Sequence, residues 1–145
     1  MIAVSEIGAE LLAVSDNGYD VIVGSTPAHP NLFADYSDHP RVLVHLSMAL
    51  SSTAAGRYQI LAKYYDAYRA QLHLPDFGHD SQDAIALQMI GECHALPMID
   101  AGEIDHAITA CSSRWASLPG NSYGQHQNKL LNLLAVYTAA GGTEA

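Results

Sequence analysis

The sequence predicts an α+β fold in which a small antiparallel sheet follows the first helix of a helical domain. Apolar residues alternate with other residues at 19–23 and again at 42–46, which is the pattern of partly exposed strands. From residue 56 onward the apolar residues recur every three to four positions, which indicates helices. A chain of 145 residues with 49% hydrophobic content fits a single domain, residues 1–145, around one core.

The first element is expected to be a short helix over residues 1–14. Its apolar side chains recur at helical spacing, and the positions expected to be buried are Ile2, Ile7, Leu11 and Val14. The turn-forming residues at 15–18 should end this helix. The sheet is expected after that turn, within residues 19–46.

Four helices are expected in the rest of the chain. The first begins at Gly56 and presents one apolar face, made of Tyr58, Leu61, Tyr65, Tyr68 and Leu72. The second covers 81–93 with Ser81 as its N-cap, and the third covers 103–115. After a loop at 116–127, the last helix covers about 128–140 and ends at Gly141.

The charge of the chain excludes several partners. The formal net charge is −9 with only six basic residues, whereas nucleic-acid binding needs Lys and Arg to neutralise phosphates. The same charge disfavours an anionic membrane surface, and no apolar run approaches the roughly 20 residues of a membrane helix. We therefore expect no nucleic-acid partner and no stable membrane association. The N-terminus has no basic segment, so no secretory signal peptide is expected.

Metal, cofactor and nucleophile chemistry find little support in the sequence. The eight histidines form no metal-binding spacing, and there is neither a G-x-S-x-G motif nor a Gly-rich phosphate loop, so no metal and no cofactor are expected. Cys111 belongs to an apolar helical face and is interpreted as a buried thiol. A bridge between Cys93 and Cys111, or a catalytic thiol, remains an alternative.

Carboxylates are the remaining candidates for catalysis. Among the 15 acidic residues, Glu6 lies at the end of an apolar helical stretch just before the expected sheet. Apolar surroundings raise the pKa of a carboxyl, as a general acid for glycoside cleavage requires. From composition alone a solvated surface position for Glu6 remains an alternative.

A set of short motifs carries a family resemblance along nearly the whole chain. In order they are AVSEIG (3–8), GYDVIVG (18–24), DYSDHPR (35–41), AGRYQ (55–59), SQDA (81–84), ALPMID (95–100), WASLPG (115–120) and YGQ (123–125). Together they resemble the lambda-phage lysozyme family of endolysins. The resemblance implies a lysozyme-like fold, and the position of Glu6 close to the start implies a short first helix.

The resemblance also implies a reaction and a site. Members of this family are similar to lytic transglycosylases, which cut the β-1,4 bond between N-acetylmuramic acid and N-acetylglucosamine and leave 1,6-anhydro ends. By position, Glu6 would be the catalytic acid, Gln59 and Tyr123 would line the substrate cleft, and Tyr19 and Asp20 would approach the sugar. Two alternatives remain: a water-using muramidase with Glu6 and Asp20 as its carboxylate pair, and a catalytically impaired glycan-binding module.

The partners and location follow from the same resemblance. The expected partner is the glycan strand of peptidoglycan, and the chain is expected to be a monomer. The family implies synthesis in the host bacterial cytoplasm, holin-dependent release, and action on the cell wall from the periplasm.

Overall fold

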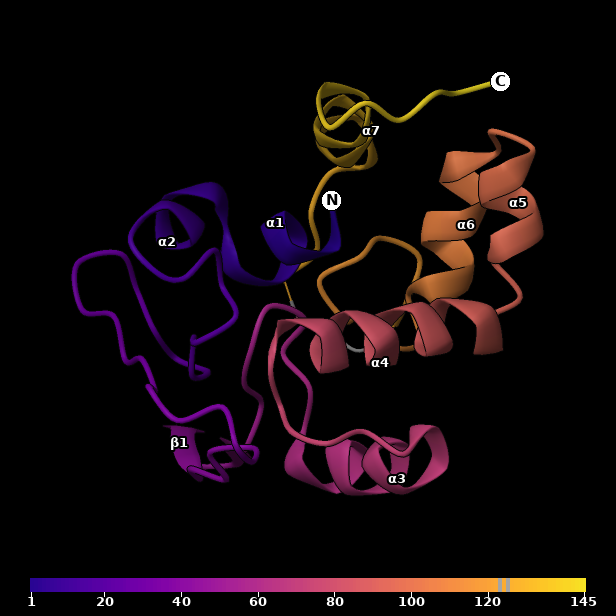
Figure 1. The fold of residues 1–145 in the computed structure, drawn as a ribbon. Coiled ribbons are helices and arrows are strands. Elements are labelled where there is room, and N and C mark those ends of the chain that lie inside the picture. Colours follow the sequence, from indigo (N-terminus) through magenta and orange to yellow (C-terminus); the bar gives the residue numbers. More distant parts are fainter. Residues whose placement is uncertain (123, 125) are drawn as a thin grey trace. The chain divides into compact units, whose positions relative to one another are not determined.

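The computed structural model describes residues 1–122, 124 and 126–145 (Figure 1). Within these residues helices predominate and one two-stranded antiparallel sheet follows the first helices, which confirms the α+β prediction. None of the described helices is long and apolar enough to cross a membrane. The elements are α1 (Ile2–Ile7), α2 (Ala9–Ala13), β1 (Val44–Ser47), β2 (Leu50–Ser52), α3 (Ala62–Leu72), α4 (His79–Glu92), α5 (Leu96–Asp100), α6 (Ile104–Cys111) and α7 (Leu130–Ala139).

The chain forms two compact units. The terminal unit contains residues 1–6 and 87–145, and the central unit contains residues 7–86. The chain passes from one unit to the other near the end of α1 and again within α4. Glu6 therefore belongs to the terminal unit, and the sheet belongs to the central unit.

The expected first helix is divided in two, so the prediction of one helix over residues 1–14 was wrong. Gly8 separates α1 from α2 and has a φ of 87°, a conformation that cannot continue a right-handed helix and that glycine adopts without strain. Leu11 is buried as expected. Val14 is 52% exposed, because it lies at the end of α2 and not on a continuous helical face.

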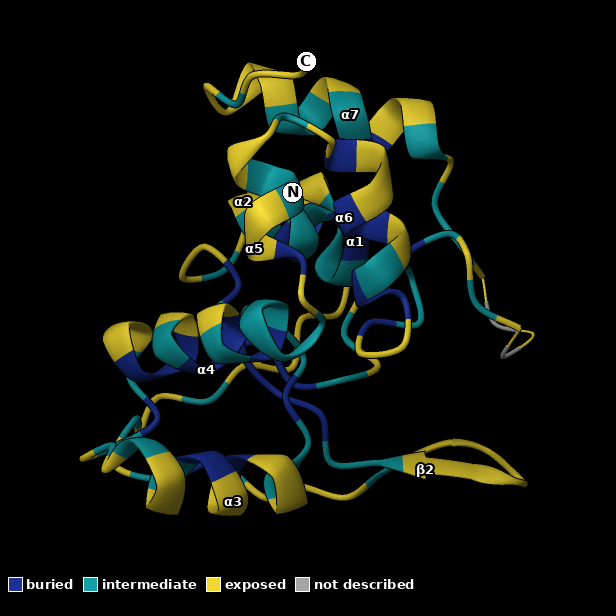
Figure 2. Ribbon diagram, turned by 90° about the vertical axis from the view of Figure 1, so that its right-hand side faces the viewer, coloured by how far each residue is buried: buried dark blue, intermediate teal, exposed yellow. Residues whose placement is uncertain are grey.

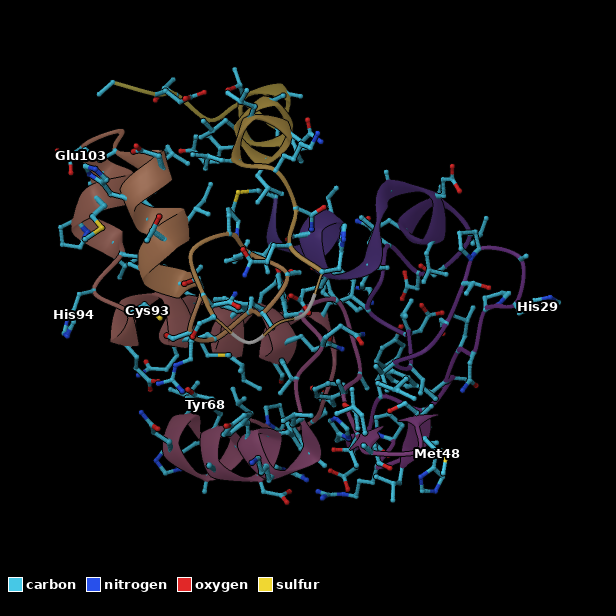
Figure 3. The ribbon with its side chains drawn as sticks, turned by 180° about the vertical axis from the view of Figure 1, so that it is seen from behind. His29, Met48, Tyr68, Cys93, His94 and Glu103 are labelled. Carbon is cyan, nitrogen blue, oxygen red and sulfur yellow. The ribbon has the colours of Figure 1, made fainter. Side chains whose placement is uncertain are left out.

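The sheet is a hairpin, and only one of the two expected strands is in it. Strand β1 pairs with β2, with His45 opposite Ser51, whereas residues 19–23 make only isolated bridges. The backbone N–H groups of Val21, Ile22 and Val23 bond to three separate segments, so no continuous ladder forms there. Figure 2 shows the hairpin as almost wholly exposed, and the fully exposed Met48 lies at its turn (Figure 3).

Helix α3 starts later than its apolar pattern predicts. Tyr65 and Tyr68 are buried as expected, but residues 56–61 form a turn and a bridge before the helix begins at Ala62. Gly56 has a φ of 77°, and a Cβ added there would clash with the Gln82 side-chain oxygen. The positive φ prevents a helical start at this glycine, and the close approach of Gln82 excludes a larger residue there.

Helix α4 begins two residues before the expected N-cap. Ser81 lies inside its first turn and donates its hydroxyl proton to Asp76 Oδ1 at 2.9 Å. Asp76 Oδ1 also accepts the Gly78 backbone N–H at 2.8 Å. Asp76 therefore binds the groups at the start of the helix, and the assignment of Ser81 as the N-cap was wrong.

The helices of the terminal unit largely follow the sequence pattern. The buried face of α6 consists of Ile104, Ala107, Ile108 and Cys111, at the expected spacing. Helix α7 covers Leu130–Ala139, and Gly141 beyond it has a φ of 92°, as a C-terminal glycine should. The short helix α5, which lies within the ALPMID motif, was not predicted.

The cysteines are both free thiols. Cys111 is buried and hydrogen-bonded to Cys93, and burial raises the pKa of the Cys111 thiol to about 12. A raised pKa keeps the thiol protonated, which makes it a poor nucleophile. The interpretation of Cys111 as a buried thiol is confirmed.

A buried histidine organises the DYSDHPR segment. The His39 side chain donates from Nε2 to the Ile60 carbonyl at 2.9 Å and accepts the Arg41 backbone N–H on Nδ1 at 3.0 Å. Beside it, Asp38 forms ion pairs with Arg41 at 3.1 Å and Arg69 at 3.2 Å, so it bridges two arginines. Both ring nitrogens of neutral His39 are thus satisfied, and burial lowers its pKa.

The lowered pKa of His39 predicts how the stability of the fold depends on pH. Below the ordinary histidine pKa of 6.5 the unfolded chain binds a proton that folded His39 does not. The free energy of unfolding should therefore fall as the pH drops from about 6.5, by at most about 1.4 kcal/mol per pH unit from this group. Urea unfolding at a series of pH values measures this slope. His39→Gln should remove that contribution, and an unchanged slope in the variant would contradict the prediction.

Candidate functional site

The Glu6 carboxyl lies near the end of α1 in a half-buried position. Burial raises its pKa above the ordinary value, and hydrogen bonds from the Ser117 hydroxyl and backbone N–H partly offset that rise. The hydroxyl donates to Glu6 Oε1. A carboxyl with a raised pKa stays protonated to higher pH than an exposed one, as a general acid needs.

Ser117, Ser5 and Asn128 form a hydrogen-bonded network in which Ser117 contacts the Glu6 carboxyl. The Ser5 hydroxyl lies 2.8 Å from the Ser117 hydroxyl, and the Asn128 side-chain amide donates to Ser5 Oγ at 3.0 Å. Asn128 also donates to the Ser5 carbonyl at 3.0 Å, and its backbone N–H donates to the Ser117 carbonyl at 2.8 Å. These contacts join α1 to the loops on either side of residue 120, within the terminal unit.

The sequence did not single out these supporting residues. Ser117 and Ser5 occur inside the WASLPG and AVSEIG motifs, but they are 112 residues apart and no spacing pattern links them. Asn128 lies just before α7, where its residue type suggests only a role at the start of the helix. A pair of motifs that each contain a serine is the only signal that could have suggested the contact.

In the central unit, Tyr19 is fixed by several contacts. Its hydroxyl donates to Asp83 Oδ1 at 2.9 Å, and Tyr58 donates to the same oxygen at 2.7 Å. The Tyr19 ring stacks on His79 at 4.0 Å, and the Arg57 guanidinium lies 5.1 Å from its centroid. This arrangement restricts the ring to one orientation on a partly exposed surface.

The carboxylate of Asp16 contacts His79, the residue on which the Tyr19 ring stacks. Asp16 Oδ2 accepts the Tyr36 hydroxyl at 2.7 Å and lies 2.7 Å from His79 Nε2. The hydrogen bond from Tyr36 is the main cause that lowers the pKa of Asp16, followed by that from His79. An ionised Asp16 thus orients His79 beneath the Tyr19 ring.

Asp20 and Gln59 both make local backbone contacts. Asp20 Oδ1 accepts the Asp16 backbone N–H at 2.9 Å, which closes the turn before residue 21. Gln59 has a φ of 50°, and its side-chain amide donates to the Gly56 carbonyl at 2.9 Å. Gln59 therefore lies in the turn that precedes α3, and not in the first turn of a helix.

The residues expected at the site fall into both units. Glu6 is in the terminal unit, while Tyr19, Asp20 and Gln59 are in the central unit. Tyr123 lies outside the described residues. Among the residues that the structure describes, no group of three or more His, Cys, Asp or Glu side chains could hold a metal ion.

Comparison with known proteins identifies the family. The model of the family described as Endolysin matches residues 1–144. The chain is 58% identical over 128 residues to the endolysin of Escherichia phage lambda, which covers 88% of this chain and 78% of that protein. It is 46% identical over 150 residues to the endolysin of Escherichia phage P2, covering 100% of this chain and 91% of that protein.

Solved structures show the same relationship. Bacteriophage lambda lysozyme complexed with a chitohexasaccharide matches with a TM-score of 0.89 and 52% identity, over 99% of this chain and 91% of that one. A further structure of lysozyme from bacteriophage lambda matches with a TM-score of 0.87 and 53% identity, over the same shares of the two chains. This likeness confirms the lysozyme-like fold. The chain therefore belongs to the endolysin family of cell-wall-degrading phage enzymes.

Proposed function

We propose that this endolysin acts as a lytic transglycosylase on the glycan strand of peptidoglycan, with Glu6 as its catalytic acid. The observation that carries the proposal is the Glu6 carboxyl, whose pKa burial raises and whose position Ser117 holds. A similar protein, lambda lysozyme, has been solved with a chitohexasaccharide, whose N-acetylated sugars resemble those of peptidoglycan.

A single carboxyl is sufficient for this reaction. In the first step, Glu6 donates its proton to the glycosidic oxygen as the bond from that oxygen to C1 of N-acetylmuramic acid breaks. In the second step, the Glu6 carboxylate takes the proton of the muramyl 6-hydroxyl as the oxygen of that hydroxyl bonds to C1. The acid is regenerated, a 1,6-anhydro ring forms, and no water is consumed.

The other expected site residues are proposed as substrate contacts. Tyr19, Asp20, Gln59 and Tyr123 would orient the sugars by hydrogen bonds and ring contacts. The fixed, partly exposed ring of Tyr19 supports a contact with a sugar face. We further propose that residues 1–145 act as one monomeric catalytic domain.

Digestion of purified sacculi tests the function. We expect the chain to release soluble muropeptides and to clear chloroform-treated Gram-negative cells. A chain that binds sacculi but leaves them insoluble would favour the glycan-binding module instead.

Substitution of Asp20 distinguishes transglycosylation from hydrolysis by two carboxylates. Its Oδ1 accepts a backbone N–H within a turn, which indicates a role in shaping the loop. Asp20→Asn should therefore keep activity to within about tenfold, whereas loss of a second catalytic carboxylate would cost on the order of 10²–10⁴-fold. Rates of sacculus digestion measure the effect, and a loss as large as that of Glu6→Gln would favour the muramidase.

The location and release route are part of the same proposal. We propose that the chain is made in the host cytoplasm and reaches the cell wall from the periplasm after a holin opens the inner membrane. Co-expression with and without a holin tests this route: lysis that needs the holin supports it, and lysis without one contradicts it.

A further inference from the structure

When Glu6 is ionised, the hydrogen bonds from Asn128 to its carboxylate form a chain with a single direction. Ser117 has one hydroxyl proton, and that proton goes to Glu6 Oε1. The Ser5 hydroxyl must then be the donor across the 2.8 Å contact to Ser117 Oγ. Ser5 Oγ in turn accepts from the Asn128 amide at 3.0 Å, so every donor in the chain points toward the Glu6 carboxyl.

We propose that Ser117, held by Ser5 and Asn128, is a positioning residue that binds Glu6 Oε1 and leaves Oε2 to carry the catalytic proton. The inference rests on the proposed function, in which Glu6 is the acid. Because Oε1 accepts the Ser117 proton, the acidic proton of the neutral carboxyl resides on Oε2. Oε2 both gives the proton to the leaving oxygen and takes one back from the 6-hydroxyl.

The surroundings of the chain keep it in this arrangement. Ser5 is only 8% exposed, so water does not readily replace Ser117 as the partner of its hydroxyl. Asn128 binds the backbone carbonyl of Ser5 through its side chain and that of Ser117 through its own N–H. These backbone contacts fix the distance between the two serines, and therefore the place where Ser117 meets the carboxyl.

The first test compares Ser117→Ala with Ser117→Thr, which keeps the hydroxyl. A general acid works only while protonated, so activity is lost as the pH rises through its pKa. Ser117→Ala removes a hydrogen bond that lowers the Glu6 pKa. The alkaline limb of the pH–rate profile should therefore move to higher pH, and kcat at the optimum should fall on the order of tenfold to hundredfold through lost orientation. Ser117→Thr should restore both.

The second test reverses the direction of the chain. Asn128→Asp puts an acceptor in place of the donor, so the Ser5 hydroxyl would turn away from Ser117. We expect the alkaline limb of the pH–rate profile to move to higher pH in this variant also. Asn132→Asp is the matched control, because it makes the same change of charge at an exposed position near the start of α7. A ¹³C NMR titration of the five glutamate carboxyls, with Glu6→Gln to identify the signal, measures the pKa directly.

Two outcomes would overturn the inference while leaving the proposed function intact. One is a Ser117→Ala variant that loses activity with an unmoved alkaline limb and an unmoved Glu6 signal. The other is an Asn128→Asp variant that behaves like Asn132→Asp. The proposed function fails separately, if Glu6→Gln retains the activity of the unchanged chain.

Discussion

Glu6→Gln should lower the rate of peptidoglycan cleavage by about 10³-fold or more, because one group supplies both proton transfers in the proposed reaction. Glutamine keeps the size of the side chain and still presents an oxygen to the Ser117 hydroxyl. The fold and the affinity for sacculi should therefore remain. Turbidity loss of chloroform-treated cells and a sacculus-binding assay measure the two properties together.

Glu10→Gln is the matched control for Glu6→Gln. Glu10 lies in the first turn of α2 and is exposed, so its loss should leave the rate unchanged. If Glu6→Gln and Glu10→Gln are equally active, another group must be the acid. If the unchanged chain is itself inactive but binds sacculi, the glycan-binding alternative gains.

Gln82→Met should lower the free energy of unfolding by about 4 kcal/mol. The Gln82 side chain is fully buried, donates to the carbonyls of Tyr19 at 3.0 Å and Phe77 at 2.8 Å, and accepts the Arg57 backbone N–H at 2.9 Å. Methionine has a similar size but leaves these three backbone groups without their partner. Each buried unsatisfied group costs about 1–3 kcal/mol. Urea unfolding followed by circular dichroism measures the loss.

Gln88→Met provides the comparison on the same helix. Gln88 is half-buried, and its amide donates to the Glu92 side chain at 3.1 Å. This substitution should cost less than about 1 kcal/mol, because water can replace a partly exposed partner. Equal losses in the two variants would show that Gln82 is not the organising contact of residues 19, 57 and 77.

Regular helices were the part of the fold that the sequence predicted well. The buried face of α6 follows from apolar residues at helical spacing, since the period is a local property of the chain. The break at Gly8 was missed because a positive φ leaves no mark in an apolar pattern that continues across it. The alternating pattern at 19–23 wrongly predicted a strand, because the backbone N–H groups of Ile22 and Val23 bond to residues 31 and 54, which only the folded chain brings to this segment.

The candidate site was predictable only in part. Apolar neighbours made Glu6 one plausible acid among 15, and it was the ordered motifs of the family that selected it. The support given by Ser117 and Asn128 depends on contacts across more than 100 residues, which no spacing rule can indicate. For Asp20, a local bond to the Asp16 backbone now gives a structural reason for its place in the motif.

The chemistry of the new glycan ends tests the central claim most directly. Purified sacculi would be digested in water enriched in oxygen-18, the products reduced at once, and their masses determined. A transglycosylase that uses Glu6 alone should give 1,6-anhydro ends without heavy oxygen, because the 6-hydroxyl and not water closes on C1. Reducible ends that carry oxygen-18 would contradict this account and establish hydrolysis by water.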